Sequence, residues 1–476
     1  MFIYGLKLSL FITFSICCFV VATYKLFFVG FGKKAVLFWL SVLPFIFLVN
    51  SEPITLLVGF ALLIFLNRGQ QPAIAVAFFI VVVSAIPDWV EHRMSAPGVN
   101  YLLRLSFDKV AVLALLVPLI GIIYKSSRVS WNVTDSLVVA FVALTTLLTF
   151  REGQVTTVMR FLIDSLLIYI IPYFVISRVI SSVEYIRYCS LAFLILAILL
   201  SAVFLVSQIV QVDIYEWLNV RGLYQGIREY RGGFLRLSGT SSGVVVGFLM
   251  LCGLLSLDML KKYRLVPPSV FWILILFFGL SVLFGGSRAG LFGFVLGIGI
   301  YAYFTKLTGF SRMVCGFVLG LLVILEYSLD LTNFFVYQDE YGTFDYRSAL
   351  YQTSWLYFQK YPLFGSPFYL ESGYFDHLVT GLGIIDIVSA YLQVALQYGF
   401  VGLLVFILMY LSVILPLFKR LLFAGGGSEE LNAYIAMYFT LNVVLAFILT
   451  TTSMISLFPT YMMVVLAVGR SLLEYR

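Results

Sequence analysis

Long apolar runs separated by short polar segments fill most of this chain. They lie at about 8–24, 35–49, 54–66, 72–87, 110–124, 133–149, 161–177, 190–210, 241–259, 269–285, 289–304, 313–328, 399–417, 431–450 and 456–473. A helix needs roughly 20 apolar residues to cross a bilayer, and only helices or closed barrels satisfy their backbone there. The runs are continuous and lack the alternation of barrel strands. The pattern therefore predicts an all-α polytopic membrane protein with about 14 transmembrane helices.

One late interval breaks this pattern and divides the chain. Residues 330–386 contain no apolar run able to cross a bilayer, and they hold seven acidic residues, two basic residues and His377. We read this interval as one large loop. The predicted regions are N-terminal transmembrane helices at 1–210, central helices at 211–329 with an arginine-rich loop at 211–240, the large loop at 330–386, and C-terminal helices at 387–476.

Composition supports the membrane class and narrows the partners. Hydrophobic residues make up 62% of the chain and charged residues 11%, whereas soluble domains are about half apolar and about a quarter charged. The net charge of +7 comes from basic residues scattered through short loops. This scatter is a topology signal and argues against nucleic acid as a partner.

Arginines and lysines are predicted to separate across the membrane. Short loops near Lys261, Lys306 and Lys419 share one side, which the positive-inside rule assigns to the cytoplasm. The large loop and ten arginines then lie outside: Arg93, Arg104, Arg151, Arg160, Arg221, Arg228, Arg231, Arg236, Arg288 and Arg347. An outward excess of arginine suits a site for phosphate or carboxylate, because the planar guanidinium binds two oxygens at once. The alternative is that these arginines pair with outward acids and lipid headgroups.

Two glycine-rich stretches could hold an anion. Arg236 precedes serines that can cap a helix starting near Gly243, and a helix N terminus beside an arginine suits a phosphate. The stretch Phe284–Gly290 predicts a tight hairpin at the outer face that carries Arg288, the only charge between Arg264 and Lys306. The alternatives are a linker whose arginines reach the interface and a simple interface anchor.

The large loop carries the remaining candidates. The segment 346–361 predicts a short amphipathic helix on the membrane surface, with Arg347 near its start and an apolar face of Ala349, Leu350, Thr353, Leu356 and Tyr357. Trp355 would either stack on a sugar or sit in the interfacial aromatic belt. His377 beside Asp376 could act as a general base, although a solvated loop histidine is the commoner case.

The second half of the chain resembles the superfamily of O-antigen ligases and Wzy-type O-antigen polymerases. The resemblance runs from about Arg231 to Leu404 and rests on four pieces in order: RLSGTSSGVVVGF, GGSRAGLFGFVLG, a loop helix ending in YPLFGSP, and SAYLQVALQYGFVGLL. It implies a GT-C type glycosyltransferase that needs no cofactor or metal. The implied donor is a glycan on undecaprenyl pyrophosphate, attacked by a hydroxyl of an acceptor glycan. Arg236 and Arg288 match arginines that the family is expected to place on the pyrophosphate.

The sequence departs from the ligase branch after the loop. Similar ligases carry a His-Asn pair before the small residue, Tyr and Leu, whereas Val388 and Ser389 precede Ala390 and Tyr391 here. This difference favours a polymerase. The predicted catalytic residues are Arg236, Arg288, Asp376, His377 and Asp386, and the predicted substrate-binding residues are Arg231, Arg347, Trp355 and Tyr391.

The favoured function is a polymerase that joins lipid-linked repeat units into O-antigen or exopolysaccharide at the periplasmic face of the bacterial inner membrane. One alternative is a ligase that transfers a glycan to lipid A core or protein. Another is a flippase or transporter for lipid-linked sugars. Against it, Asp164 and Glu326 are the main charges within apolar runs, no internal repeat is detected, and charge collects at the outer face. An enzyme of this kind commonly depends on a flippase and a chain-length regulator as partners.

Overall fold

The computed structural model describes the chain in thirteen stretches. They are residues 30–49, 51–87, 90–96, 99–125, 131–211, 230–231, 234–237, 242–261, 267–307, 343–380, 383–423, 428–454 and 457–475. All structural statements below concern these residues. The predicted spans at 8–24 and 313–328, together with Glu326, lie outside them.

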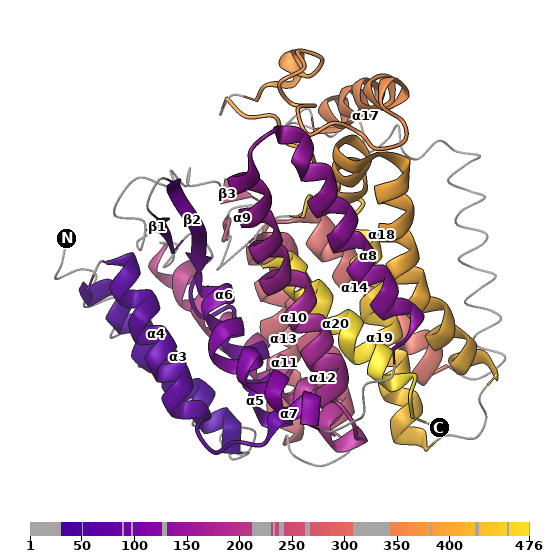
Figure 1. Ribbon diagram of the computed structural model, residues 1–476. Helices are drawn as coiled ribbons and strands as arrows, with labels where there is room; N and C mark the ends of the chain where they lie inside the picture. The colour runs from indigo at the N-terminus through magenta and orange to yellow at the C-terminus, as the bar shows by residue number, and fades with distance from the viewer. Residues whose placement is uncertain are drawn as a thin grey trace.

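Helices make up most of the described structure, and they follow the predicted apolar runs (Figure 1). The first half holds α3 (Gly30–Val49), α4 (Glu52–Asn67), α5 (Pro72–Val82), α6 (Phe107–Ala111), α7 (Val117–Lys125), α8 (Val133–Thr149), α9 (Val155–Ser165), α10 (Ile171–Val179) and α11 (Val183–Val210). The second half holds α12 (Gly243–Lys261), α13 (Pro268–Phe284), α14 (Arg288–Thr305), α17 (Thr343–Lys360), α18 (Ala390–Phe423), α19 (Glu429–Ile448) and α20 (Phe458–Leu472). Two π-helical turns, at Val112–Leu116 and Leu166–Ile170, connect α6 to α7 and α9 to α10.

Eight helices of the described part are long and apolar enough to cross a membrane, counting α6–α7 and α9–α10 as single continuous segments. Shorter apolar helices are α4, α5, α13 and α20. The helix α11 is the most deeply buried of the long segments and packs against α5, α12 and α13. A helix that is apolar on every side is suited to such a central position. The polytopic helical class is thus confirmed, while the count of about fourteen spans stays a prediction.

The helical bundle has two ends, which we call the loop end and the opposite end. Helix α17 lies over the loop end (Figure 1), where α12, α14 and α18 begin. The opposite end is closed by contacts between helix termini. There Lys306 Nζ binds Asp258 Oδ2 at 2.8 Å, and Arg420 donates to the carbonyl oxygens of Leu472 and Leu473 at 2.7 and 3.1 Å. The arrangement agrees with the predicted alternation of charged loops.

An all-α description needs one correction, because the described part of the chain contains two small antiparallel sheets. Strands β1 (Glu91–Ala96) and β2 (Val99–Ser106) form a hairpin, and β3 (Tyr230–Arg231) pairs with β4 (Phe234–Leu235). The hairpin had a sequence signal in the Pro-Gly pair between its strands, followed by apolar residues at every second position from Val99 to Leu105. Its backbone hydrogen bonds are satisfied between strands instead of within a helix.

The predicted loop helix is confirmed as α17, with one error in its buried face. Leu350 and Tyr357 are buried in a small core with Tyr369, Phe375 and Ile387. Leu356, which we placed on the same face, is instead 59% exposed. The face that packs on the loop is therefore narrower than the sequence pattern indicated, and this small core gives the large loop a structure of its own.

Candidate functional site

Arg236 and the turn before Arg288 meet at the loop end. Leu237 N–H donates to the carbonyl oxygen of Phe284 at 2.9 Å, which fixes the chain after β4 to the end of α13. A Cβ atom at Gly286 would lie only 3.0 Å from Cγ of Arg236. The Arg236 side chain therefore lies against the turn that carries Arg288, which begins α14 and is exposed. Two motifs about fifty residues apart in the sequence thus form one surface.

The N termini of α12 and α14 lie side by side at this surface. A Cβ atom at Gly243 would collide with the carbonyl oxygen of Gly285, and one at Gly247 would lie 2.7 Å from Cα of Gly290. Only glycine permits this approach of two backbones. Ser287 Oγ caps α14 by accepting from Gly290 N–H at 3.2 Å. Two helix N termini with two arginines produce a positive potential suited to phosphate oxygens.

The C terminus of α19 connects this surface to the large loop. The rings of Phe292 and Phe447 lie 5.8 Å apart, so α14 packs on α19 near its end. The Tyr351 hydroxyl of α17 donates to the carbonyl oxygen of Thr450 at 3.3 Å. Ala390 N–H donates to the carbonyl oxygen of Leu449 at 2.9 Å. The arginine surface and the segment leading into α18 therefore flank the same helix end.

Asp386 is held next to α17 by its backbone. Its N–H donates to the Tyr346 hydroxyl at 2.9 Å, and that hydroxyl donates to the Asp386 carbonyl oxygen at 3.0 Å. The residue keeps exposed surface, yet partial desolvation raises the pKa of the Asp386 carboxyl above its ordinary value, and the charge of Arg347 opposes this rise. A carboxylate with a raised pKa is a better proton acceptor. The structure thus brings Arg347 and Asp386 together.

Asp376 and His377 lie in a separate turn, which contacts α17 at a different point. They begin a short 3-10 turn, Asp376–Leu378, and His377 Nε2 lies 3.2 Å from Thr353 Oγ1. Thr353 follows Tyr346 by seven positions, which is roughly 10 Å along a helix. The three predicted acceptor-positioning residues therefore occupy two separate places, with Asp386 in one and His377 in the other.

The remaining predicted substrate-binding residues differ in their surroundings. Trp355 is 60% exposed on α17, and its ring stacks on Phe358 at 6.0 Å. The Tyr391 hydroxyl donates to the carbonyl oxygen of Ala446 at 2.9 Å and so ties α18 to α19. The backbone of Arg231 lies in β3, while its side chain is outside the described part. Substrate binding by these residues stays a prediction.

Several of the arginines predicted to face outward contact other parts of the protein. Arg104 Nε lies 3.3 Å from Glu91 Oε1 across the hairpin. Arg160 Nε donates to the Tyr101 carbonyl oxygen at 2.7 Å, and its guanidinium lies 4.0 Å from the Tyr101 ring centroid. Arg93 lies 5.5 Å from the same ring. Arg93, Arg104 and Arg160 thus make contacts within or onto the hairpin. The ten arginines predicted to lie outside therefore do not form a single ligand site.

Asp164, one of the two main charges noted within apolar runs, has a partner. Lys109 Nζ lies 2.6 Å from Asp164 Oδ1 and also donates to the Arg104 carbonyl oxygen at 2.7 Å. Sequence reasoning missed this pair because Lys109 and Asp164 belong to different helices. Tyr346 was also missed as a partner of Asp386, since nothing in the local sequence marks such a contact.

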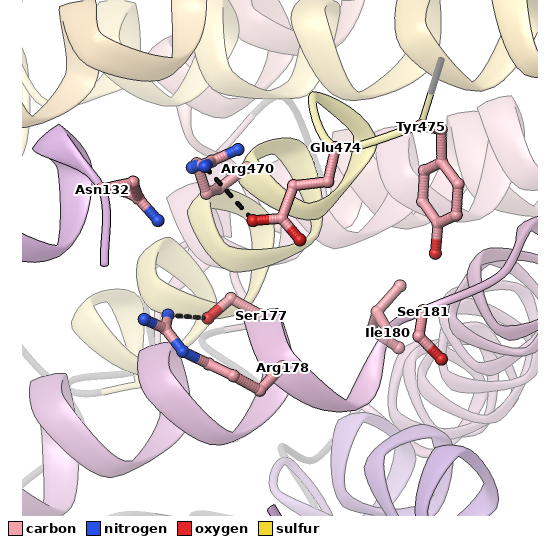
Figure 2. A pocket seen from close by; sticks show the side chains of 8 residues that line it. All are labelled: Asn132, Ser177, Arg178, Ile180, Ser181, Arg470, Glu474 and Tyr475. Atoms are coloured by element: carbon pink, nitrogen blue, oxygen red, sulfur yellow. Dashed lines mark hydrogen bonds and ion pairs between the residues drawn. The ribbon is translucent and has the colours of Figure 1, made fainter. Parts of the chain in front are cut away.

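A cavity of about 220 Å³ lies at the opposite end (Figure 2). Arg178 and Arg470 line it, but each binds a carboxylate: Arg178 contacts Asp135 through two nitrogens, and Arg470 Nη2 lies 3.2 Å from Glu474 Oε1. Arg178 also donates to Ser177 at 2.7 Å (Figure 2). Arg178 thus joins α10 to the start of α8, while Arg470 pairs with a residue four positions later in the chain, and the loop end is the better candidate for the active site.

Comparison with known families supports this choice. Residues 272–407 match the model of the O-antigen ligase family, Wzy_C. The matched segment includes Arg288, Arg347 and Asp386, and it confirms the resemblance to the O-antigen ligase and Wzy superfamily. Neither a curated protein nor a solved structure matches the chain significantly. A family domain and the apolar helices together indicate a multi-pass membrane protein that acts in glycan transfer.

Proposed function

We propose that the protein is a GT-C type polymerase that joins undecaprenyl-pyrophosphate-linked repeat units into O-antigen or exopolysaccharide. The reaction would take place at the periplasmic face of the bacterial inner membrane. The observation that carries this proposal is the surface where Arg236 lies against the turn of Arg288 and where α12 and α14 begin. Its residues from α13 and α14 belong to the O-antigen ligase domain.

The chemistry fits the charges of this surface. The acceptor hydroxyl attacks the anomeric carbon of the donor, and the bond from that carbon to the pyrophosphate oxygen breaks. Negative charge collects on the leaving pyrophosphate, where Arg236, Arg288 and the two helix N termini would stabilise it. Asp386 would accept the proton of the attacking hydroxyl, and Arg347 would bind a phosphate or sugar oxygen nearby.

The residues before α18 favour a polymerase over a ligase. Val388 packs against the small core of the loop, and Ser389 Oγ accepts from Leu392 N–H at 3.4 Å at the start of α18. These two residues stand where similar ligases have the expected base, and neither can serve as one. The matched family is that of the O-antigen ligases, which keeps ligation as the second candidate.

The product distribution separates these candidates. The purified protein would be given a short undecaprenyl-pyrophosphate oligosaccharide from its own pathway, and the products would be resolved by size. We expect a ladder of lengths. A single product on a lipid A core or protein acceptor would support the ligase instead, while transport of the labelled lipid without any change in its size would support a flippase.

A further inference from the structure

Helix α18 is broken near its start, and the large loop fills the break. Gly399 has φ 68° and ψ −165°, which interrupts the helix between Ala390 and Phe423. A break of this kind leaves backbone groups without helical partners. Phe400 N–H instead donates to the carbonyl oxygen of Pro362 at 2.8 Å, and Val401 N–H donates to that of Leu363 at 3.1 Å. The loop therefore completes the hydrogen bonding of a membrane helix.

Two glycines allow this contact. A Cβ atom at Gly399 would collide with the backbone of Leu363 and Phe364, and one at Gly365 would collide with the carbonyl oxygen of Leu396. Both glycines also have positive φ, at 68° and 61°. Backbone packs directly on backbone at this point, so the position of the loop is defined closely.

Arg151 joins the two backbones from a third element. It belongs to the short 3-10 turn Phe150–Glu152 after α8. Its guanidinium donates to the carbonyl oxygens of Phe364 at 2.9 Å, Gly365 at 2.8 Å and Gln397 at 3.0 Å. Its Nε donates to the Leu148 carbonyl oxygen at 2.8 Å, which orients the guanidinium plane. One side chain thus holds α8, the large loop and α18 together.

We propose that Arg151 is a positioning residue that holds the large loop over the active site, an inference that rests on the proposed polymerase function. The segment that Arg151 binds, at Phe364 and Gly365, follows α17 directly. The first half of α17 carries Tyr346 and Arg347, which lie beside Asp386. Fixing the end of α17 through Phe364 and Gly365 therefore fixes the acceptor side of the site relative to Arg288 of α14. Arginine is required because a single planar group must reach three carbonyl oxygens.

The test combines amide hydrogen exchange with kinetics on the full-length protein in lipid nanodiscs. Arg151→Ala is expected to speed exchange at Ser366, Phe400 and Val401. It should also lower kcat for chain extension by about 10- to 100-fold, because small displacements of reacting groups are costly. The KM for the lipid-linked donor should stay within about twofold, since the donor arginines are untouched. Arg151→Lys should show a smaller change of the same kind.

Arg160→Ala is the matched control, because Arg160 also donates to a backbone carbonyl at the loop end but to the hairpin. It should leave exchange at Ser366, Phe400 and Val401 unchanged. Unchanged exchange in Arg151→Ala would contradict the proposal that Arg151 holds the loop. Faster exchange with a normal kcat would contradict the role of Arg151 in positioning the site. If the wild-type protein extends no glycan, the polymerase proposal fails, but the exchange measurement still decides whether Arg151 holds the loop.

Discussion

Arginines at the two ends of the bundle have different surroundings. At the opposite end Arg178 and Arg470 bind Asp135 and Glu474, and the charges cancel. At the loop end Arg236 lies against a glycine turn, and Arg288 begins α14 beside the N terminus of α12. At this end the helix N termini contribute positive potential of their own. The comparison teaches that the surroundings of an arginine indicate its role. Arginines beside acidic side chains are structural, whereas those beside helix N termini are candidates for ligand binding.

The largest expected effect lies at the opposite end and concerns stability. Asp135 is fully buried and accepts from Arg178 and from the Tyr173 hydroxyl at 2.8 Å. Arg178→Ala leaves this carboxylate buried without its cation, which should cost about 3–5 kcal/mol of unfolding free energy. Thermal unfolding in detergent would measure the loss.

The control for this prediction removes both charges. The double variant Arg178→Met with Asp135→Leu should recover much of the stability, because no uncompensated charge remains. A single Arg178→Ala variant as stable as wild type would contradict the view that the opposite end uses arginine structurally.

The next effect concerns the acceptor side of the loop end. Asp386→Asn should lower kcat for chain extension by about 100-fold, or about 2.7 kcal/mol, because the amide cannot accept a proton. Stability should not fall, since desolvation disfavours the charged carboxylate that the variant removes. Asp376→Asn, at the other place on α17, is the control and should retain most activity. Loss of activity in Asp376→Asn alone would move the base to the His377 turn.

The smallest effect is a shift in pH dependence. Because desolvation raises the pKa of Asp386, the rate should fall as the pH drops through a value above the ordinary aspartate range. Arg347→Ala removes the charge that opposes this rise, so the acid limb of kcat/KM should move to higher pH. The same raised pKa makes the folded loop bind this proton more tightly than the unfolded chain. Its stabilising contribution is therefore greatest below the unfolded pKa and is lost as the pH rises through the folded pKa.

A control outside this contact sharpens the pH prediction. Lys360 lies 5.5 Å from the ring centroids of Tyr361 and Tyr374, at the other end of α17. Lys360→Ala should leave the acid limb where the wild-type protein has it. Equal shifts in Arg347→Ala and Lys360→Ala would show a general charge effect and not a contact with Asp386.

Local sequence patterns were sufficient for the helices and for the arginine turn. Apolar runs locate α8 and α19 within a few residues, and the glycines of the stretch 284–290 predict the turn between α13 and α14. These features depend on neighbours in the sequence. The hairpin β1–β2 was missed because long apolar runs on both sides made its two short strands inconspicuous.

Contacts between distant segments could not be predicted in the same way. The three carbonyl oxygens that Arg151 binds belong to residues more than two hundred positions away. The adjacency of Asp386 and Tyr346 likewise depends on how the loop folds back on α17. Periodicity identifies which face of a helix is buried, but it does not identify the partner of that face.

The most direct test compares one arginine from each end. Arg288→Ala and Arg470→Ala would be purified, and chain extension of an undecaprenyl-pyrophosphate oligosaccharide would be followed by product size. Our account predicts at least about a 100-fold loss of extension for folded Arg288→Ala, because the substitution removes a guanidinium that stabilises the leaving pyrophosphate. It predicts near-normal extension for Arg470→Ala, whose ion pair with the half-exposed Glu474 contributes little. A normal ladder from Arg288→Ala would contradict the assignment of the loop end as the donor site.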